Sequence, residues 1–417
     1  MKVKIYPNGL TVIVEETPAL RSVTAGIMVG TGSNYETPEN NGISHFIEHM
    51  QFKGTATRSA ERIVGEFDRM GAVYNAFTGK EYTCYYFKSI DEKTEPCFDV
   101  LADLFLHSTY DKKELDRERK VILEEINMSK DEPDGVCYDV LYKTAFPAQS
   151  LGMEILGTKE NVSRFGKTDI EAYKKYNYLP GNTVVAFVGN ITERAALGLV
   201  EKYIGELVAA PYSPVRELGI QTFNAGYGEF VHDYEQSEMS IAYPCLTFGD
   251  DRAATLSALD CILGNGMSSR LFQRLREKMG LVYSVYTAPR LGKTNGLFTV
   301  CANVNAVNIE GAVAAIRNET ELLIAHGVTQ EETEKAKMQL KVTALFSKEN
   351  PMNYMLALMR RRTVLGLDYD LDDLLKKIEA ITADDINALA REIFSLEPAI
   401  SYAGKTPPVD IAAVYKQ

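Results

Sequence analysis

The chain shows the same order of apolar and polar runs twice. Near the start of each half, two runs rich in Val, Ile and Thr predict strands, a helical pattern follows them, and a further strand comes later. This order of elements, more than residue identity, indicates an internal repeat of roughly 200 residues. The predicted strands are residues 10–14, 22–29 and 183–190 in the first half and 228–232, 238–243 and 296–303 in the second, and the predicted helices lie at about 39–53 and 251–264.

Turn signals divide the chain near its middle. Residues 208–222, which include Pro211 and Pro214, follow an amphipathic segment and predict a linker. We therefore expect two domains, residues 1–210 and residues 217–417. Because strands and helices are mixed in both halves, we expect an α+β fold in which helices pack on one face of each sheet.

Two histidines four residues apart, His45 and His49, are the strongest chemical signal in the sequence. On a helix they lie on one face, one turn apart, where they can bind the same metal ion. Glu48 lies on the same side and can accept a proton from water during catalysis. A surface helix that carries two histidines by chance is the alternative, and the spacing alone does not exclude it.

A carboxylate-rich segment, residues 114–126, predicts a second helix. At about 100° per residue, Glu118 and Glu125 lie in its apolar sector, whereas Glu124 faces water. Because an unpaired buried charge is costly, a metal ion or a salt bridge, for example to Arg119, should compensate these carboxylates. Two His and one carboxylate with an open position form a catalytic zinc pattern, so one glutamate is a candidate ligand and the other a candidate orienting group. The periodicity does not rank the two.

The segment around the histidines, residues 42–55, resembles the inverzincins, a family of zinc peptidases that includes pitrilysin, insulin-degrading enzyme and mitochondrial processing peptidase. Glu125 meets the family's spacing between the second histidine and the third zinc ligand, since 125 − 49 = 76. The resemblance therefore implies that His45, His49 and Glu125 bind one Zn²⁺ per chain, and that Glu48 is the catalytic base.

Two other positions near the site, Glu118 and Gln51, can be compared with the family pattern. Glu118 matches the family's second acidic position, and we expect it to orient a ligand and tune its charge. Gln51 departs from the family, in which an apolar residue is expected, but it should not affect the metal chemistry. The resemblance covers essentially the whole chain and implies two homologous halves, each a mostly antiparallel sheet with helices on one face, of which only the first binds zinc.

Residues 73–83 resemble the family's substrate-binding hairpin, with two β-rich runs around a turn at 78–80. An exposed strand edge there can pair with an extended peptide. The resemblance implies that Asn75 and Ala76 contact the substrate backbone. The alternative for Asn75 is a turn or bulge residue that hydrogen-bonds its own chain.

A further match lies in the second half, where a predicted helix ends at Gly280 and a strand begins at Leu281. Arg276 and Tyr283, seven residues apart, match a family pair that helps bind the scissile peptide. Both side chains can donate hydrogen bonds to a developing oxyanion. A surface arginine and a core tyrosine are the alternative reading.

Composition agrees with a soluble enzyme of two or three domains, with 45% apolar and 24% charged residues. The net charge of −12 disfavours a nucleic-acid binder, which usually carries a basic patch. Six scattered cysteines without a Cys-x-x-Cys pair indicate free thiols in a reducing compartment. With no signal peptide, transit peptide or transmembrane run, we expect a cytoplasmic protein that does not bind membranes.

The resemblance also implies an assembly. Larger family members carry four such domains, with zinc in the first half of the chain and the Arg/Tyr pair in the last quarter. This chain carries both elements, which favours a homodimer that encloses a chamber for peptides or unfolded segments, with Arg276 and Tyr283 facing the zinc of the other subunit. The alternatives are a catalytic subunit that needs a different partner and a scaffold without activity, like the family's core subunits in respiratory complexes.

Overall fold

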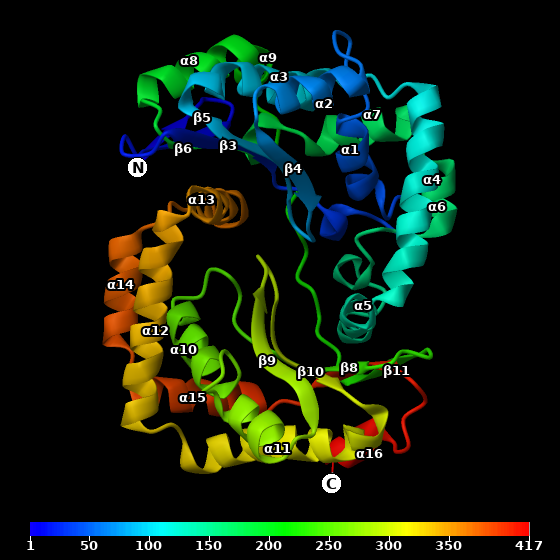
Figure 1. The fold of residues 1–417 in the computed structure, drawn as a ribbon, viewed down its shortest axis with the longest axis vertical. Helices are drawn as coiled ribbons and strands as arrows, with labels where there is room; N and C mark the ends of the chain where they lie inside the picture. Colours follow the sequence, from blue (N-terminus) through cyan, green and yellow to red (C-terminus); the bar gives the residue numbers. More distant parts are fainter. Residues whose placement is uncertain (417) are drawn as a thin grey trace. The chain divides into compact units, whose positions relative to one another are not determined.

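The computed structural model describes residues 1–416 as two compact units, each built around one β-sheet (Figure 1). The first unit contains Met1–Ile126, Glu154–Leu218 and Phe346–Tyr369, and the second contains Asn127–Met153, Gly219–Leu345 and the described residues from Asp370 onward. None of the helices in residues 1–416 combines the length and the apolar content that a membrane span needs.

The first sheet has six strands in the order β1-β2-β6-β3-β5-β4. Only β2 and β6 are parallel, and all other neighbours are antiparallel. The prediction of a mostly antiparallel sheet is therefore confirmed. The strands are β1 Lys2–Ile5, β2 Thr11–Glu16, β3 Ser22–Val29, β4 Val73–Thr78, β5 Thr83–Ile90 and β6 Thr183–Gly189.

The central strand β3 is apolar on both of its faces. Ala25 and Ile27 point into the main core of the unit, whereas Met28 points to the opposite face, and all three side chains are fully buried. A strand that is covered on both faces needs apolar residues at successive positions, so its sequence reads as a continuous run. This explains why the pattern at residues 22–29 predicts the strand with its observed bounds.

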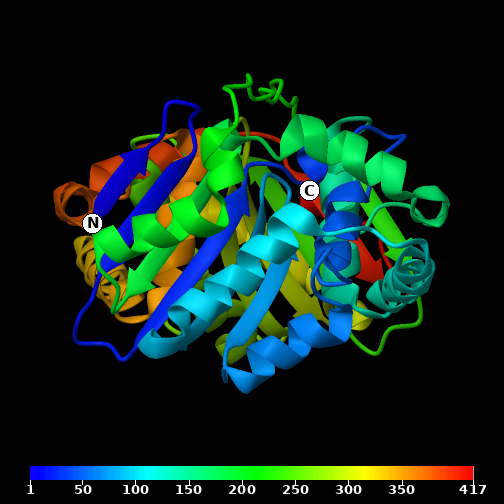
Figure 2. The ribbon, with the colours of Figure 1, turned by 90° about the horizontal axis from the view of Figure 1, so that it is seen from above.

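Helices on one face of the first sheet close the main core, as predicted. In Figure 2, α3 and α8 cross the strands on the same side of the sheet. A second group of helices packs around a smaller core and carries the candidate site. The first group is α2 Ala60–Arg69, α3 Thr94–His107, α8 Glu193–Tyr203 and α9 Gly205–Ala209, and the second is α1 Ile43–Gln51, α4 Lys112–Met128, α6 Lys159–Arg164 and α7 Lys167–Asn177.

The second unit repeats this plan. Its sheet has the order β7-β11-β8-β10-β9, and only β7 and β11 are parallel. Most of its helices cover one face and form a single large core. The strands are β7 Gly226–Val231, β8 Ser237–Pro244, β9 Val282–Leu291, β10 Gly296–Val304 and β11 Ala399–Gly404, and the helices are α10 Ala253–Leu263, α11 Ile309–His326, α12 Gln330–Glu349, α14 Leu371–Ala380, α15 Ala383–Phe394 and α16 Ile411–Lys416.

Each sheet is covered on its other face by one helix from the opposite half of the sequence. α13, Pro351–Leu365, packs Met355 and Leu358 on the first sheet. α5, Pro133–Ala145, packs Leu141 and Ala145 on the second sheet. The compact units are therefore not two continuous halves of the chain. The division into residues 1–210 and 217–417 stays a prediction, although residues 211–225 contain no helix or strand.

The two units are related by a nearly constant shift in residue number. The first residues of β2 and β7 differ by 226 − 11 = 215, those of α3 and α11 by 309 − 94 = 215, and those of α5 and α13 by 351 − 133 = 218. The same elements therefore recur in the same order, and the predicted internal repeat is confirmed with a period slightly longer than expected.

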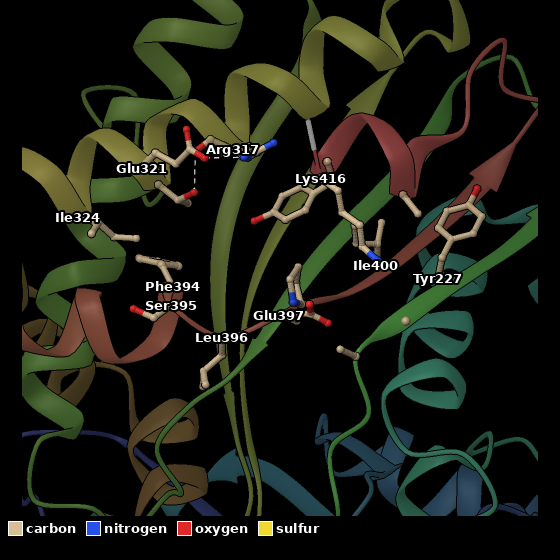
Figure 3. A pocket seen from close by; sticks show the side chains of 16 residues that line it. Tyr227, Arg317, Glu321, Ile324, Phe394, Ser395, Leu396, Glu397, Ile400 and Lys416 are labelled. Atoms are coloured by element: carbon tan, nitrogen blue, oxygen red, sulfur yellow. Dashed lines mark hydrogen bonds and ion pairs between the residues drawn. The ribbon is translucent and has the colours of Figure 1, made fainter.

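Two elements differ between the two units. Among the described residues, the second unit has no strand equivalent to β1, and α16 has six residues where the equivalent helix α8 has 11. A cavity of about 460 Å³ lies beside α16, with the side chains of Arg317, Phe394 and Lys416 in its wall (Figure 3). In the first unit, the end of α8 and the following α9 contribute apolar residues to the main core.

The α13 contact with the first sheet can be tested by truncating a buried side chain. Leu358→Ala should lower the free energy of unfolding of the first unit by about 2–5 kcal/mol, because Leu358 is fully buried and its loss leaves a cavity. Urea unfolding followed by circular dichroism measures the change. Asn353→Ala, at an exposed position of the same helix, is the matched control and should leave the transition within about 0.5 kcal/mol. Equal effects of the two substitutions would contradict the packing.

Candidate metal centre

Helix α1 begins at an unusual cap that fixes its direction. Gly42 has a left-handed backbone, with φ of 98°, and a side chain there would approach the Gly157 Cα to 2.8 Å. The buried Glu36 carboxylate accepts hydrogen bonds from the backbone N–H groups of Gly42 (2.7 Å) and Ser44 (2.8 Å). It therefore satisfies donors of the first turn.

The two histidines of α1 lie together as the spacing predicts. Their ring centroids are 4.6 Å apart. Glu125 of α4 reaches both rings, with its Oε1 3.8 Å from His45 Nε2 and its Oε2 3.5 Å from His49 Nε2. One donor atom from each of the three residues lies within 4.8 Å of the others. Among residues 1–416, this is the one group of His, Cys, Asp and Glu side chains that meets this geometric condition.

These donors fit a zinc ion. Nitrogen and oxygen ligands bind zinc at about 2.0–2.1 Å in a tetrahedral arrangement, which places neighbouring ligand atoms roughly 3.4 Å apart. The separations between Glu125 and the two imidazoles are close to that value. Two imidazoles and one carboxylate also leave a fourth position open, as catalytic zinc sites do.

Glu118 orients one of the imidazoles from behind. Its Oε1 lies 2.7 Å from His49 Nδ1, and its Oε2 lies 2.7 Å from Lys53 Nζ. Burial alone would raise the pKa of Glu118, but its hydrogen bonds to His49 and Lys53 lower the pKa overall. The carboxylate therefore stays ionised, holds a proton on Nδ1 and leaves Nε2 free to bind a metal. The orienting role of Glu118 stays a prediction, and these contacts place the carboxylate where that role requires it.

The partner of Glu118 differs from the predicted alternative. A salt bridge to Arg119 is wrong, because the Arg119 guanidinium instead donates to the carbonyl oxygens of Val162 and Phe165. Adjacent residues on a helix point about 100° apart, so the Arg119 guanidinium lies away from the Glu118 carboxylate. Lys53 supplies the compensating charge.

The helical period predicts the exposure of Glu124 correctly and the burial of Glu125 only in part. Glu124 is exposed, as predicted, whereas the Glu125 side chain is 43% exposed and lies at the border of the apolar sector. A ligand at this border can reach the histidines and still leave the metal position open to substrate.

The surroundings shift the pKa values of the two histidines in opposite directions. Burial, with the neighbouring charge of His49, lowers the pKa of His45 to about 3, so its imidazole is neutral and can donate a lone pair to a metal. Burial would also lower the pKa of His49, but the hydrogen bond and charge of Glu118, with the charges of Glu125 and Glu48, raise it overall. A bound cation would oppose this and favour the neutral imidazole.

Glu48 lies beside the candidate ligands and is held by one hydroxyl. Its Oε2 accepts a hydrogen bond of 2.6 Å from Thr78 Oγ1, on the last residue of β4. Burial raises the pKa of Glu48, and the Glu125 charge adds to this, whereas Thr78 and His49 act in the opposite direction. Thr78 has no signal in the sequence, because its contact with Glu48 depends on where a strand and a helix meet.

Gln51, the departure from the family pattern, is fully buried but has polar partners. Its Nε2 donates to the Phe105 carbonyl (3.2 Å), and its Oε1 accepts from Tyr110 Oη (3.0 Å). Lys174 Nζ contacts the same carbonyl at 3.0 Å and the same hydroxyl at 2.8 Å. Burial lowers the pKa of Lys174 to about 7. This network ties the end of α1 to α3 and α7 without touching a candidate ligand.

The predicted hairpin is present, with β4 at the edge of the first sheet. The turn comprises residues 79–82, one position later than expected, and is closed by Gly79 N–H to the Tyr82 carbonyl (2.8 Å). Asn75 is exposed, and its Oδ1 accepts from the Ala76 backbone N–H at 2.8 Å, which is the local bond of the alternative reading. Contact of Asn75 and Ala76 with a substrate stays a prediction.

Arg276 and Tyr283 lie together in the second unit. The guanidinium carbon is 5.8 Å from the Tyr283 ring centroid and 4.9 Å from that of Phe272. Arg276 is on a π-helix, Phe272–Lys278, a form that is frequent at functional sites. The register of β9 shifts at residue 283, and Tyr283 is 75% exposed, which excludes the alternative of a core tyrosine. The predicted end of this helical segment at Gly280 agrees with its left-handed φ of 63°.

Known proteins are similar to this chain over most of its length. Residues 11–159 match the family described as insulinase (peptidase family M16), and residues 164–340 match the family described as peptidase M16 inactive domain. The uncharacterized zinc protease YmxG of Bacillus subtilis is 38% identical over 96% of this chain and 98% of its own length. The uncharacterized zinc protease SCO5738 of Streptomyces coelicolor is 35% identical over 95% of this chain and 88% of its own length.

Solved structures share the fold at lower identity. A protease from Helicobacter pylori superposes with a TM-score of 0.86 at 21% identity and covers 97% of this chain and 99% of its own. A chain of the Candida albicans complex III dimer superposes with a TM-score of 0.85 at 17% identity and covers 100% of this chain and 99% of its own. These likenesses support two homologous α+β halves.

The roles of Glu118 and Glu125 can be separated by metal analysis. Glu125→Gln should abolish stoichiometric zinc binding, because it replaces the charged ligand. Glu118→Gln should weaken zinc affinity by about 10–100-fold, because His49 loses its anionic partner. Glu124→Gln, at the adjacent exposed position, is the matched control and should bind zinc normally. Elemental analysis and competition with a chelator measure these effects, and zinc loss in Glu118→Gln but not in Glu125→Gln would exchange the two roles.

Proposed function

The chain belongs to peptidase family M16, the insulinase family, a family of zinc proteases, and on this premise we propose that it is a zinc-dependent endopeptidase that hydrolyses peptides or unfolded protein segments. The observation that carries the proposal is the convergence of the donor atoms of His45, His49 and Glu125 beside the carboxylate of Glu48. Metal donors and a proton acceptor at one place are what hydrolysis of an amide bond requires.

The proposed roles follow from the contacts of each residue. His45, His49 and Glu125 hold the metal, with one ion per chain. When bound, zinc supplies a Lewis acid that polarises a carbonyl and makes water acidic enough to attack it near neutral pH. Glu48 accepts the proton of the attacking water and delivers it to the leaving amine nitrogen. Glu118, held by Lys53, keeps His49 in the tautomer that a metal needs.

The substrate would lie extended along the edge of the first sheet. β4 is the terminal strand of that sheet, so its outer backbone groups are available to pair with a peptide. We assign Asn75 and Ala76 to contacts with the peptide backbone. We assign Arg276 to bracing the substrate backbone, and Tyr283 to donating a hydrogen bond to the oxygen that becomes negative during attack. The exposure of Tyr283 supports this role, because a donor to substrate must be accessible.

A scaffold without activity is the second candidate function. The fold is shared with a chain of a respiratory complex, so the architecture alone does not separate a scaffold from an enzyme. The complete ligand set and the pinned Glu48 carboxylate favour the enzyme. A scaffold requires neither a set of metal ligands nor a positioned carboxylate.

We infer a homodimer as the working assembly, with a chamber that admits peptides and excludes folded proteins. The inference rests on the presence of both the metal site and the Arg/Tyr pair in one two-unit chain. A heterodimer with a different partner subunit is the alternative. The six cysteines are all free thiols, which agrees with a reducing compartment such as the cytoplasm.

Replacement of the proposed base tests the reaction. Glu48→Gln should lower kcat by about 10²–10⁴-fold, because glutamine has the same shape but cannot accept the proton. Zinc content should stay at the wild-type level, since Glu48 is not one of the three donors. Cleavage of an unstructured peptide mixture, followed by mass spectrometry with and without chelator, measures the effect. Glu61→Gln, on the exposed start of α2, is the control. Undiminished hydrolysis by Glu48→Gln would exclude the role.

A mixing experiment tests whether the site is shared between subunits. A Glu48→Gln chain and a Tyr283→Phe chain should each be nearly inactive, whereas their heterodimer should regain about one working site. Differently tagged chains allow the heterodimer to be purified before the assay. Heterodimers without any recovered activity would contradict an arrangement in trans, and a purified wild-type chain that stays monomeric and inactive would favour a separate partner.

A further inference from the structure

We propose that Thr78 is the positioning residue of the catalytic base: its hydroxyl fixes the Glu48 carboxylate and thereby reserves Oε1, the other oxygen, for the proton. The inference rests on the proposed function. It assigns a task to a residue that the metal chemistry does not use, and it makes the last residue of β4 part of the hydrolytic apparatus.

The contact itself is short and selective. Thr78 Oγ1 donates to Glu48 Oε2 at 2.6 Å, the range of a hydroxyl bound to an ionised carboxylate. A glutamate side chain has several rotatable bonds, and holding it in one rotamer removes freedom that would otherwise be lost in the reaction. Because Oε2 is occupied by the hydroxyl, a proton arriving from water meets a free Oε1.

The hydroxyl is itself held in a rigid frame. The backbone of Thr78 pairs with that of Thr83 across the hairpin. The turn that follows is bonded to residues 33 and 34 through the carbonyls of Gly79 (3.2 Å) and Lys80 (2.8 Å). The backbone approach there is so close that a Cβ on Gly32 would meet the Gly79 oxygen at 2.2 Å. The hairpin end therefore cannot shift easily relative to the segment before α1.

The carboxylate is fixed from its own side as well. Glu48 lies on α1, whose first turn is bonded to Glu36 and whose last residue, Gln51, is bonded to Phe105 and Tyr110. With both backbones anchored, the remaining freedom belongs to the Glu48 side chain. The hydrogen bond from Thr78 restricts that freedom.

The bond also links substrate binding with proton transfer. β4 is the edge strand on which we propose that the peptide adds, and Thr78 is the residue of that strand that touches the base. A peptide that pairs with β4 therefore orders the same strand that orients Glu48. A peptide that binds elsewhere gains nothing from this contact.

The experiment compares three variants of the full-length chain. Thr78→Val removes the hydroxyl with little change in shape, and kcat should fall by about ten- to a hundredfold, the worth of a hydrogen bond to a charged group. KM should change by less than about threefold, and zinc content should be unchanged, because neither the strand edge nor the ligands are altered. Thr78→Ser keeps the donor and should restore most of kcat.

The matched control is the cross-strand neighbour. Thr83→Val removes a buried hydroxyl bond from the same hairpin without touching Glu48, so it reports the purely structural cost of such a change. Its kcat should stay within about twofold of wild type. Crystal structures give a readout besides activity: Glu48 should occupy one rotamer in the wild type and more than one in Thr78→Val.

The outcomes separate the two proposals. A wild-type chain that binds zinc, is assembled and cleaves no peptide would overturn the proposed function and this inference with it. An active wild type with a Thr78→Val variant of equal kcat, or with equal losses in Thr78→Val and Thr83→Val, would overturn the inference alone. A loss in Thr78→Val that Thr78→Ser does not recover would assign the effect to packing of the side chain and would also overturn it.

Discussion

The buried carboxylate of Glu118 is the interaction on which the site depends. It joins two helices that are distant in sequence, since α4 supplies the carboxylate, α1 supplies His49, and the turn after α1 supplies Lys53. Removing one partner from a buried ion pair typically costs about 3–5 kcal/mol, because the other charge is left without compensation. The register between the two helices is therefore strongly specified. Only in that register does Glu125, two turns further along α4, meet both imidazoles.

Polar groups at both ends of α1 support this arrangement. Glu36 binds the first turn, and the Gln51 network binds the last. All of these groups are buried, and buried polar groups are expensive unless they are paired in one geometry. A core made only of apolar side chains would allow α1 to rotate or slide by small amounts. The polar contacts remove these alternatives and hold the metal donors within the narrow distances that zinc requires.

Much of the fold could be predicted from the sequence because local patterns reflect local geometry. The strand at residues 22–29 and the exposure of Glu124 against the burial of Glu118 follow directly from strand and helix periods. β1 and β11 were not identified as strands, since short segments carry little periodic signal. Lys53 lies only four residues after His49. Its place in the sequence could therefore have indicated that it, and not Arg119, pairs with Glu118.

Other features depend on long-range arrangement and have no local signal. Thr78 and Glu48 are 30 residues apart and meet only because the end of β4 lies against α1. α5 and α13 each bury several apolar side chains, but no periodicity in the sequence tells which sheet a helix will cover. The repeat itself does not help, because a helix that packs within its own half would produce the same pattern.

The exchange of α5 and α13 gives the chain a mutual dependence between its two halves. Neither half of the sequence contains all the segments that cover its own sheet, because α13 covers Met28 and Val184 of the first sheet and α5 covers Ala242 and Leu297 of the second. Isolated halves would each expose an apolar sheet face to water. The two halves consequently behave as complementary parts of one folding unit. A break within residues 211–225 would leave two fragments that stay associated, because α5 and α13 each cover the sheet of the other fragment.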